Sequence, residues 1–177
     1  MTLNAVGFYE VVAVTGHRRT DVEAALAGTG VRSVFNPNYA AGEMLSSIQA
    51  GISAVHPGAD AILVCLGDQP QMQAATVETI LVEGERTGWQ QVIIPSYRMR
   101  AGHPILIPSS LRLQIMDATE SLRVALRAGK HRIKYVDVET ATILADLDTP
   151  ADYAASGQAA AGRAATGNSD RSEQPCE

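Results

Sequence analysis

The chain has 177 residues, of which 46% are apolar, so it is long enough to bury the core of a single domain. Its net charge of −5 argues against a protein that binds nucleic acid or an anionic membrane surface, because such proteins present a cationic face. No apolar run approaches the roughly 20 residues that cross a bilayer, and the first residues lack the basic region of a secretory signal. Cys65 and Cys176 make an implausible disulfide pair, which favours a cytoplasmic protein.

Predicted strands and helices alternate along the chain. Short runs rich in β-branched residues predict strands at 8–14, 31–35, 61–66, 92–95, 104–107 and 133–138. Caps and helix stops predict helices at 22–27, 44–55, 77–86, 110–116, 121–128 and 149–153. This alternation is typical of a layered α/β domain in which helices cover both faces of a mostly parallel sheet. Segment 104–107 is the exception, because a turn at 98–102 allows it to pair with 92–95.

The last part of the chain has a different composition. Residues 156–177 contain no Leu, Ile, Val, Phe, Tyr or Trp. Such a segment cannot bury enough apolar surface to offset the entropy that it loses on ordering. We therefore expect a folded domain at 1–155 and a disordered tail at 156–177.

Acidic residues follow the predicted strands where an open α/β sheet binds its ligands. Asp68 comes directly after the apolar run 61–66, and Mg²⁺ prefers one or two carboxylates with phosphate oxygens and water. Initiation of the next helix explains Asp68 equally well. Asp146 and Asp148 are candidates for a second carboxylate. A capping box that begins at Thr149 accounts for the residues after them but not for these two.

Two further segments carry polar groups suited to a ligand. His103 is restricted by the proline that follows it, and its imidazole can bond a substrate phosphate or base, or simply the backbone of its own turn. Gly42, Ser46 and Ser47 surround the start of the predicted helix 44–55 and offer amides and hydroxyls to a base or phosphate. Serine is common at helix starts, so this second signal is weak by itself.

Five segments, in this order, resemble the MobA-like nucleotidyltransferase family: VTGHR at 14–18, NPNYAAGEMLSSIQAG at 36–51, LGDQP at 66–70, GHPILI at 102–107 and LADLDTPADY at 144–153. Within the family the chain most resembles the molybdenum cofactor cytidylyltransferases. The resemblance implies a three-layer Rossmann-like fold and an enzyme that transfers a nucleoside monophosphate from an NTP to a phosphorylated acceptor, releasing pyrophosphate. For the subgroup, CMP would pass from CTP to the molybdopterin-type molybdenum cofactor.

The resemblance also assigns roles to residues. Asp68 would be the catalytic residue and would bind the Mg²⁺ that bridges the triphosphate, with Asp146 or Asp148 as a further metal ligand. The nucleotide would lie against Asp68 and against Gly42, Leu45, Ser46 and Ser47. The acceptor would lie against Gly102, His103 and Pro104. Elementary chemistry agrees, because bringing two phosphates together requires positioning and charge neutralisation rather than a protein nucleophile.

The chain departs from the family at its N-terminus. The family begins with a strand that runs into a Gly-rich loop bearing Arg and Lys, which wraps the triphosphate, and residues 1–7 contain no counterpart. The absent strand is central in the resembling fold, so we expect unpaired sheet edges where the first βα unit is missing. An N-terminally truncated reading of a longer enzyme is favoured over a degenerate relative, because the other motifs are intact. Either way, we expect the chain as written to be weakly active or inactive.

Two alternative functions stay open at the level of sequence. The first is a related transferase that uses GTP or another acceptor, since base choice depends on loop details. The second is a non-catalytic module that binds a nucleotide or cofactor and delivers it to a partner, such as a molybdoenzyme or its chaperone.

Overall fold

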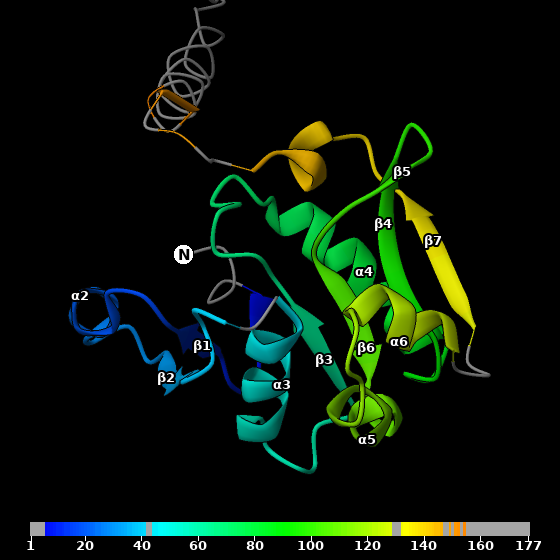
Figure 1. Cartoon of the computed structure of the whole chain (residues 1–177). Coiled ribbons are helices and arrows are strands. Elements are labelled where there is room, and N and C mark those ends of the chain that lie inside the picture. Colours follow the sequence, from blue (N-terminus) through cyan, green and yellow to red (C-terminus); the bar gives the residue numbers. More distant parts are fainter. Residues whose placement is uncertain are drawn as a thin grey trace, which may run out of the picture.

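The computed structural model describes residues 6–41, 44–128, 132–146, 149, 151–152 and 154, and it forms two sheets with helices packed around them (Figure 1). Gly42, Asp148 and the predicted tail at 156–177 lie outside the described residues. Among the residues that the structure describes, the search for a membrane-spanning helix found none.

The smaller sheet is built from the first two strands of the described chain. Strands β1 (Val12–Thr15) and β2 (Arg32–Phe35) pair in parallel, with Val12 opposite Arg32 and Thr15 opposite Phe35. The crossover between them contains α2 (Arg19–Leu26), which buries none of its residues and protrudes from the molecule (Figure 1). Helix α2 begins earlier than predicted because Arg18 takes a left-handed conformation and starts it.

The larger sheet has five strands. Their bounds are β3 (Ala61–Val64), β4 (Val92–Tyr97), β5 (Arg100–Ala101), β6 (Ile105–Pro108) and β7 (Ile133–Asp137). The order is β3-β6-β4-β5, and β7 pairs with β4. Strand β6 is antiparallel to both β3 and β4, which confirms the predicted pairing across the turn, while β7 is parallel to β4. Strands β3, β4 and β7 therefore run in one direction.

The remaining helices cover the two faces of the larger sheet. They are α3 (Met44–Ala54), α4 (Ala74–Arg86), the 3₁₀ turn η1 (Ser109–Leu111), α5 (Arg112–Met116), α6 (Leu122–Ala128) and the 3₁₀ turn η2 (Ala141–Leu144). Helix α4 begins at Ala74, before the predicted start at residue 77, and the side chain of Thr76, which is a possible cap for the predicted helix, lies buried within its first turn. The predicted capping box is present, since Thr149 and Asp152 exchange hydrogen bonds.

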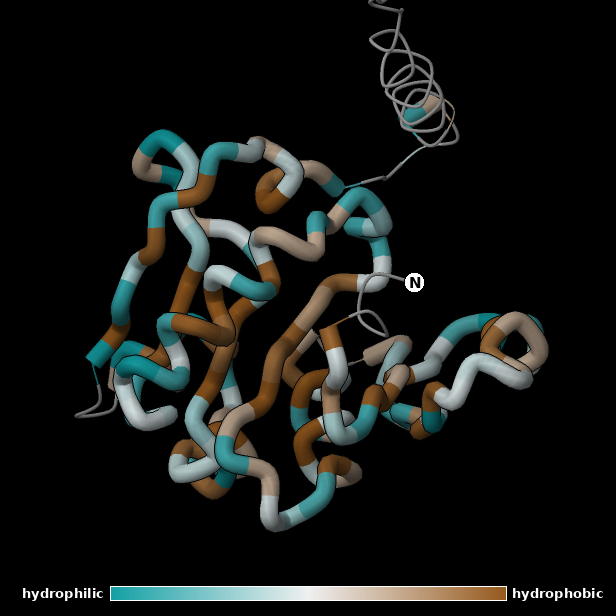
Figure 2. Tube along the Cα trace, turned by 180° about the vertical axis from the view of Figure 1, so that it is seen from behind, coloured by the Kyte–Doolittle hydropathy of each residue, from teal (hydrophilic) through white to brown (hydrophobic). Residues whose placement is uncertain are grey.

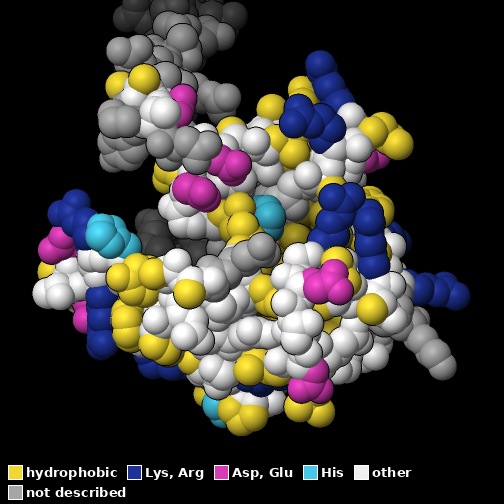
Figure 3. All heavy atoms as spheres, in the orientation of Figure 1, with side chains coloured by type: hydrophobic (Ala, Val, Ile, Leu, Met, Phe, Trp, Pro, Cys, Tyr) yellow, Lys and Arg dark blue, Asp and Glu magenta, His cyan; other side chains and the backbone are white. Residues whose placement is uncertain are grey.

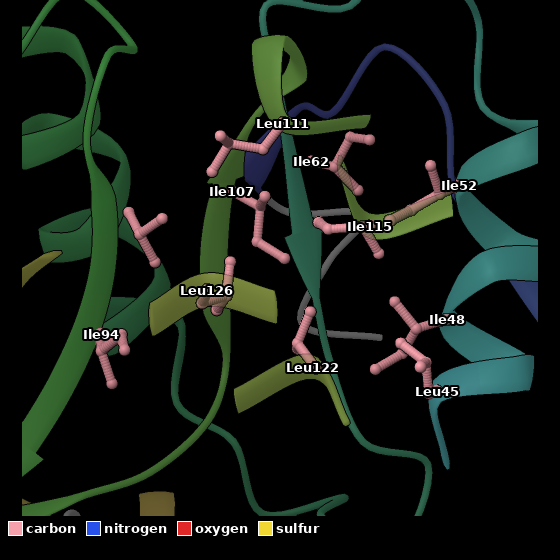
Figure 4. Packing of buried hydrophobic residues seen from close by; sticks show 11 residues of the cluster. Leu45, Ile48, Ile52, Ile62, Ile94, Ile107, Leu111, Ile115, Leu122 and Leu126 are labelled. Atoms are coloured by element: carbon pink, nitrogen blue, oxygen red, sulfur yellow. The ribbon is translucent and has the colours of Figure 1, made fainter. Parts of the chain in front are cut away.

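Alternate residues of the central strands point into two separate cores. Ile62, Ile94 and Ile107 pack under α3, α5 and α6, whose buried side chains point toward them in Figure 4. Ile93 and Leu106 face the opposite way and pack under Ile80 of α4. Burial on both faces is expected for strands in the middle of a three-layer α/β domain. Hydrophobic residues accordingly concentrate along the strands, and hydrophilic ones on the loops (Figure 2).

The two sheets are not joined into one. Within the described chain β1 pairs only with β2, and β3 pairs only with β6, so each sheet has an open edge. Helix α3 spans both, because it contacts β1 and β2 while its buried Ile48 and Ile52 share a core with Ile62 of β3. This arrangement matches the expectation of unpaired sheet edges at this place in the fold.

Candidate active site

The topology brings four separate segments to one edge of the larger sheet. Because β3, β4 and β7 run in the same direction, the residues after each of them emerge at that edge, and the residues before the antiparallel β6 start there. These segments are 65–70, the β4–β5 hairpin, 102–104 and the chain that leads through η2 to Asp146. Acidic side chains and a histidine lie near one another on the face shown in Figure 3. Ligands bind at this kind of edge in open α/β sheets.

Asp68 lies in the exposed turn that follows β3. Its carboxylate has no hydrogen-bond or ion-pair partner among the residues that the structure describes. Helix α4 begins only at Ala74, and its N-cap is Gln73, which makes no side-chain capping bond. The helix-initiating interpretation of Asp68 is therefore wrong, and its carboxylate is available to a ligand.

Asp146 is held close to this turn by glutamine side chains. The buried Gln69 donates a hydrogen bond from Nε2 to Oδ1 of Asp146 at 2.7 Å, across 77 residues of sequence. Nε2 of Gln71 donates to the backbone carbonyl of Ala145. These two contacts join the segment before residue 147 to the Asp68 turn. Asp148, the other predicted second carboxylate, lies outside the described residues.

His103 occupies the same edge and is electrostatically coupled to both carboxylates. Its half-buried position lowers the pKa of the imidazole, while the negative charges of Asp146 and Asp68 act in the opposite direction. Burial dominates, so the pKa stays below its usual value and the ring is uncharged at neutral pH. The fold therefore places three of the predicted site residues, Asp68, His103 and Asp146, near enough for their charges to interact. A neutral imidazole can both donate and accept a hydrogen bond.

The neighbours of His103 attach this segment to η2. The backbone N–H of His103 donates to the carbonyl of Ile143 at 3.1 Å, and that of Gly102 donates to Pro95 at 3.0 Å. A Cβ atom at Gly102 would overlap with the carbonyl oxygen of Ile143, so only glycine permits this approach. Pro104 follows a cis peptide bond and is fully buried. These contacts hold the segment 102–104 against η2, which leads to Asp146.

Three of the predicted nucleotide-binding residues, Leu45, Ser46 and Ser47, lie in the first turn of α3, at the same end of the molecule as the carboxyl end of β3 (Figure 1). Leu45 points into the hydrophobic core, so its side chain supports the first turn of α3 from inside the domain. The hydroxyls of Ser46 and Ser47 accept hydrogen bonds from Nδ2 of Asn36, at 2.9 and 3.0 Å. Asn36 is only 2% exposed and anchors the first turn of α3 to the end of β2.

Sequence reasoning did not single out Asn36 or Gln69, although both stand in quoted motifs. Each residue carries an amide side chain near the end of a predicted strand. The neighbouring sequence does not distinguish an amide that hydrogen-bonds to a distant segment of the fold from one that faces solvent. The available signal was their position immediately after a predicted strand, where ligand sites form in this class of fold.

The donor set at this edge suits a hard divalent cation. Carboxylate oxygens of Asp68 and Asp146 are the ligands that Mg²⁺ and Mn²⁺ prefer, with substrate phosphates and water completing the shell. No three His, Cys, Asp or Glu side chains within the described ranges come close enough to hold a metal by themselves. The residues therefore fit a cation that arrives with phosphate oxygens better than one held in a protein cage.

This sheet, with carboxylates beyond its strand ends, is the architecture of the Rossmann-like nucleotidyltransferases. A nucleotidyl transferase from Methanothermobacter superposes with a TM-score of 0.74, at 24% identity, over 92% of this chain and 78% of its own. The family model of the MobA-like NTP transferase domain matches residues 1–137. The chain belongs to this family.

Two relatives illustrate the similarity. The molybdenum cofactor cytidylyltransferase of Escherichia coli K12 is 29% identical over 158 residues, which cover 85% of this chain and 76% of that protein. The crystal structure of Rv0371c from Mycobacterium tuberculosis H37Rv has a TM-score of 0.72 and 26% identity, and covers 89% of this chain and 79% of its own. A manganese complex of that protein has a TM-score of 0.70 and 25% identity, with coverages of 87% and 80%.

Proposed function

We propose that this chain provides the catalytic edge of a cytidylyltransferase, which transfers CMP from CTP to the molybdopterin-type molybdenum cofactor and releases pyrophosphate. The observation that carries the proposal is that Asp68, Asp146 and His103 share the edge beyond β3. Gln69, the neighbour of Asp68, donates a hydrogen bond to Asp146, and the charges of both carboxylates act on His103. Similarity to a molybdenum cofactor cytidylyltransferase supports the choice of base and acceptor. We place the reaction in the cytoplasm, with a molybdoenzyme or its chaperone as receiver of the product.

In the proposed reaction an oxygen of the acceptor phosphate attacks the α-phosphorus of CTP. A new P–O bond forms, the bond from the α-phosphorus to the oxygen that bridges it to the β-phosphate breaks, and pyrophosphate leaves. Mg²⁺ bound by Asp68 and Asp146, with Asp148 as a further candidate, would neutralise the charge that builds up on the phosphates. Neutral His103 can donate a hydrogen bond to the acceptor. The segment from Gly102 to Pro104, which hydrogen bonds hold to Pro95 and Ile143, would orient the acceptor. A protein nucleophile is not required.

The nucleotide would bind between Asp68 and the first turn of α3. The Asn36 amide orients the hydroxyls of Ser46 and Ser47. We propose Gly42, which lies outside the described residues, as a further residue of the nucleotide site. The open edges of β1 and β3 support the view that a further strand, carrying the triphosphate loop, belongs between them in the complete domain. We propose that the domain ends near residue 155 and that such a strand is needed for full activity.

Calorimetric titration with CTP and GTP, with and without Mg²⁺, tests this proposal. We expect CTP binding that depends on Mg²⁺ and weakens at least about tenfold in Asp68→Asn, because the substitution removes the charge but keeps the shape. Binding that ignores both Mg²⁺ and this substitution would refute the proposed metal role. Preference for GTP would instead identify a related transferase with another base.

A non-catalytic binding module is the second candidate, and the open sheet edges favour it for the chain as it stands. Pyrophosphate release separates the two functions. We expect release from CTP and cofactor when the chain is joined to a family strand and Gly-rich loop. Mg²⁺-dependent binding without any release in that fusion would support the binding module.

A further inference from the structure

One buried amide connects the two carboxylates of the proposed metal site. Gln69 is 7% exposed, although Asp68 and Pro70 on either side of it are exposed. Its side chain turns inward and donates from Nε2 to Oδ1 of Asp146 at 2.7 Å. The two adjacent side chains therefore differ in environment: the carboxylate of Asp68 is exposed, whereas the amide of Gln69 is buried and bonds to the second carboxylate, Asp146.

Little else determines where the Asp146 carboxylate lies. Within the described chain, Gln69 is the sole hydrogen-bond donor to this carboxylate. The backbone before it is attached through Ile143, which accepts from His103, and through Ala145, which accepts from Gln71. Those contacts place the main chain, and the Gln69 bond then selects the direction of the side chain.

An amide has the right chemistry for this task. The bond from Gln69 engages only Oδ1 of Asp146. The other oxygen keeps its lone pairs for a cation. A lysine or arginine in the same place would orient the carboxylate equally well but would cancel its charge and weaken its attraction for a metal. A neutral donor orients the ligand and preserves its charge.

We infer that Gln69 is a positioning residue, which sets the Asp146 carboxylate as the second ligand of the divalent cation that enters with the nucleotide. This inference rests on the proposed function, because it needs a metal at Asp68. It goes beyond that function by giving a role to a residue that is not itself a proposed ligand of the substrate or the metal.

The test uses the purified chain with Mn²⁺ as the probe. The electron paramagnetic resonance signal of free Mn²⁺ is titrated with and without CTP, for wild type, Gln69→Met and Asp68→Asn. Methionine keeps the length and flexibility of glutamine but cannot donate. We expect Gln69→Met to weaken Mn²⁺ binding about 10-fold or more, the usual effect of removing a partner of a metal ligand.

Gln114→Met is the matched control. Gln114 also donates a side-chain hydrogen bond, from Nε2 to the carbonyl of Ala125, but it joins α5 to α6, away from the site. Hydrogen–deuterium exchange of residues 141–146 provides a second readout that needs no metal. We expect faster exchange there in Gln69→Met and unchanged exchange in Gln114→Met. If the methionine variant does not fold, Gln69→Asn shortens the side chain while keeping the amide, and the same loss is expected.

The outcomes separate this inference from the proposed function. Unchanged Mn²⁺ affinity in Gln69→Met, with strong loss in Asp68→Asn, overturns the positioning role and leaves the metal site standing. Equal losses in Gln69→Met and Gln114→Met also overturn it, because they indicate general destabilisation. Wild-type protein that binds no Mn²⁺ with CTP, or binding unaffected by Asp68→Asn, contradicts the proposed function and this inference together.

Discussion

Replacing Gly102 by alanine should disturb both the fold and the candidate site. The added Cβ would overlap with the carbonyl oxygen of Ile143 and lie 2.8 Å from its carbonyl carbon. Carbon atoms pack without strain at about 3.5–4.0 Å, so η2 must move by roughly 1 Å. That shift breaks the bond from His103 to Ile143, which has a length of 3.1 Å.

The cost follows from these two effects. Overpacking a rigid contact costs about 1–3 kcal/mol, and the lost backbone hydrogen bond adds about 1 kcal/mol. For a domain of this size each kcal/mol lowers the melting temperature by about 2–4 °C, so we expect a decrease of roughly 5–15 °C. Thermal unfolding followed by circular dichroism measures it.

Gly67→Ala is the matched control, because a Cβ atom there meets nothing within 4 Å. We expect its melting temperature to stay within about 1 °C of wild type, since surface changes of this kind have small effects. A Gly102→Ala protein as stable as Gly67→Ala would refute the close approach of segment 102–104 to η2. Because η2 leads to Asp146, Mn²⁺ affinity should fall only in the Gly102 variant.

Three further predictions concern titration, packing and reactivity. Because the pKa of His103 is lowered in the folded state, the unfolded chain binds a proton at this residue first as pH falls, so His103 adds stability above pH 6.5 that is lost as pH falls through the lowered pKa. In urea unfolding at pH 5.5 and 7.5, the free energy of unfolding should depend less on pH in His103→Gln than in wild type. An equal dependence in the two proteins would contradict the buried environment assigned to His103. Ile107 is 1% exposed on a strand that lies between two others, so Ile107→Ala should lower the free energy of unfolding by about 2–5 kcal/mol. Leu113 is 79% exposed, so the control Leu113→Ala should lower it by less than about 0.5 kcal/mol. Similar losses in both variants would argue against the described core. Burial raises the pKa of the Cys65 thiol to about 12, so iodoacetamide at pH 8 should label Cys65 only after the protein unfolds. Peptide mapping measures this labelling. Rapid labelling of Cys65 in the native protein would show that the thiol is accessible.

The sequence predicted the elements and the family because both signals are local or nearly so. Apolar periodicity and helix stops located the strands and helices, with errors mainly at their ends, as at Arg18 and Thr76. The motif around Asp68 indicated a site after β3 for the same reason, since a carboxylate beyond an apolar run is visible in a few residues. The open sheet edges were also expected, because residues 1–7 contain no counterpart of a strand that is central in the resembling family.

Tertiary structure alone decided how these segments meet. No local pattern links Gln69 to Asp146, which are 77 residues apart, and the bond forms because sheet order brings their loops to one edge. The depressed pKa of His103 likewise depends on burial by distant segments. The helix-cap interpretation of Asp68 failed only when the start of α4 was located. Local propensity specifies each element at small entropic cost, whereas contacts between distant residues form only after the whole fold has brought the chain together.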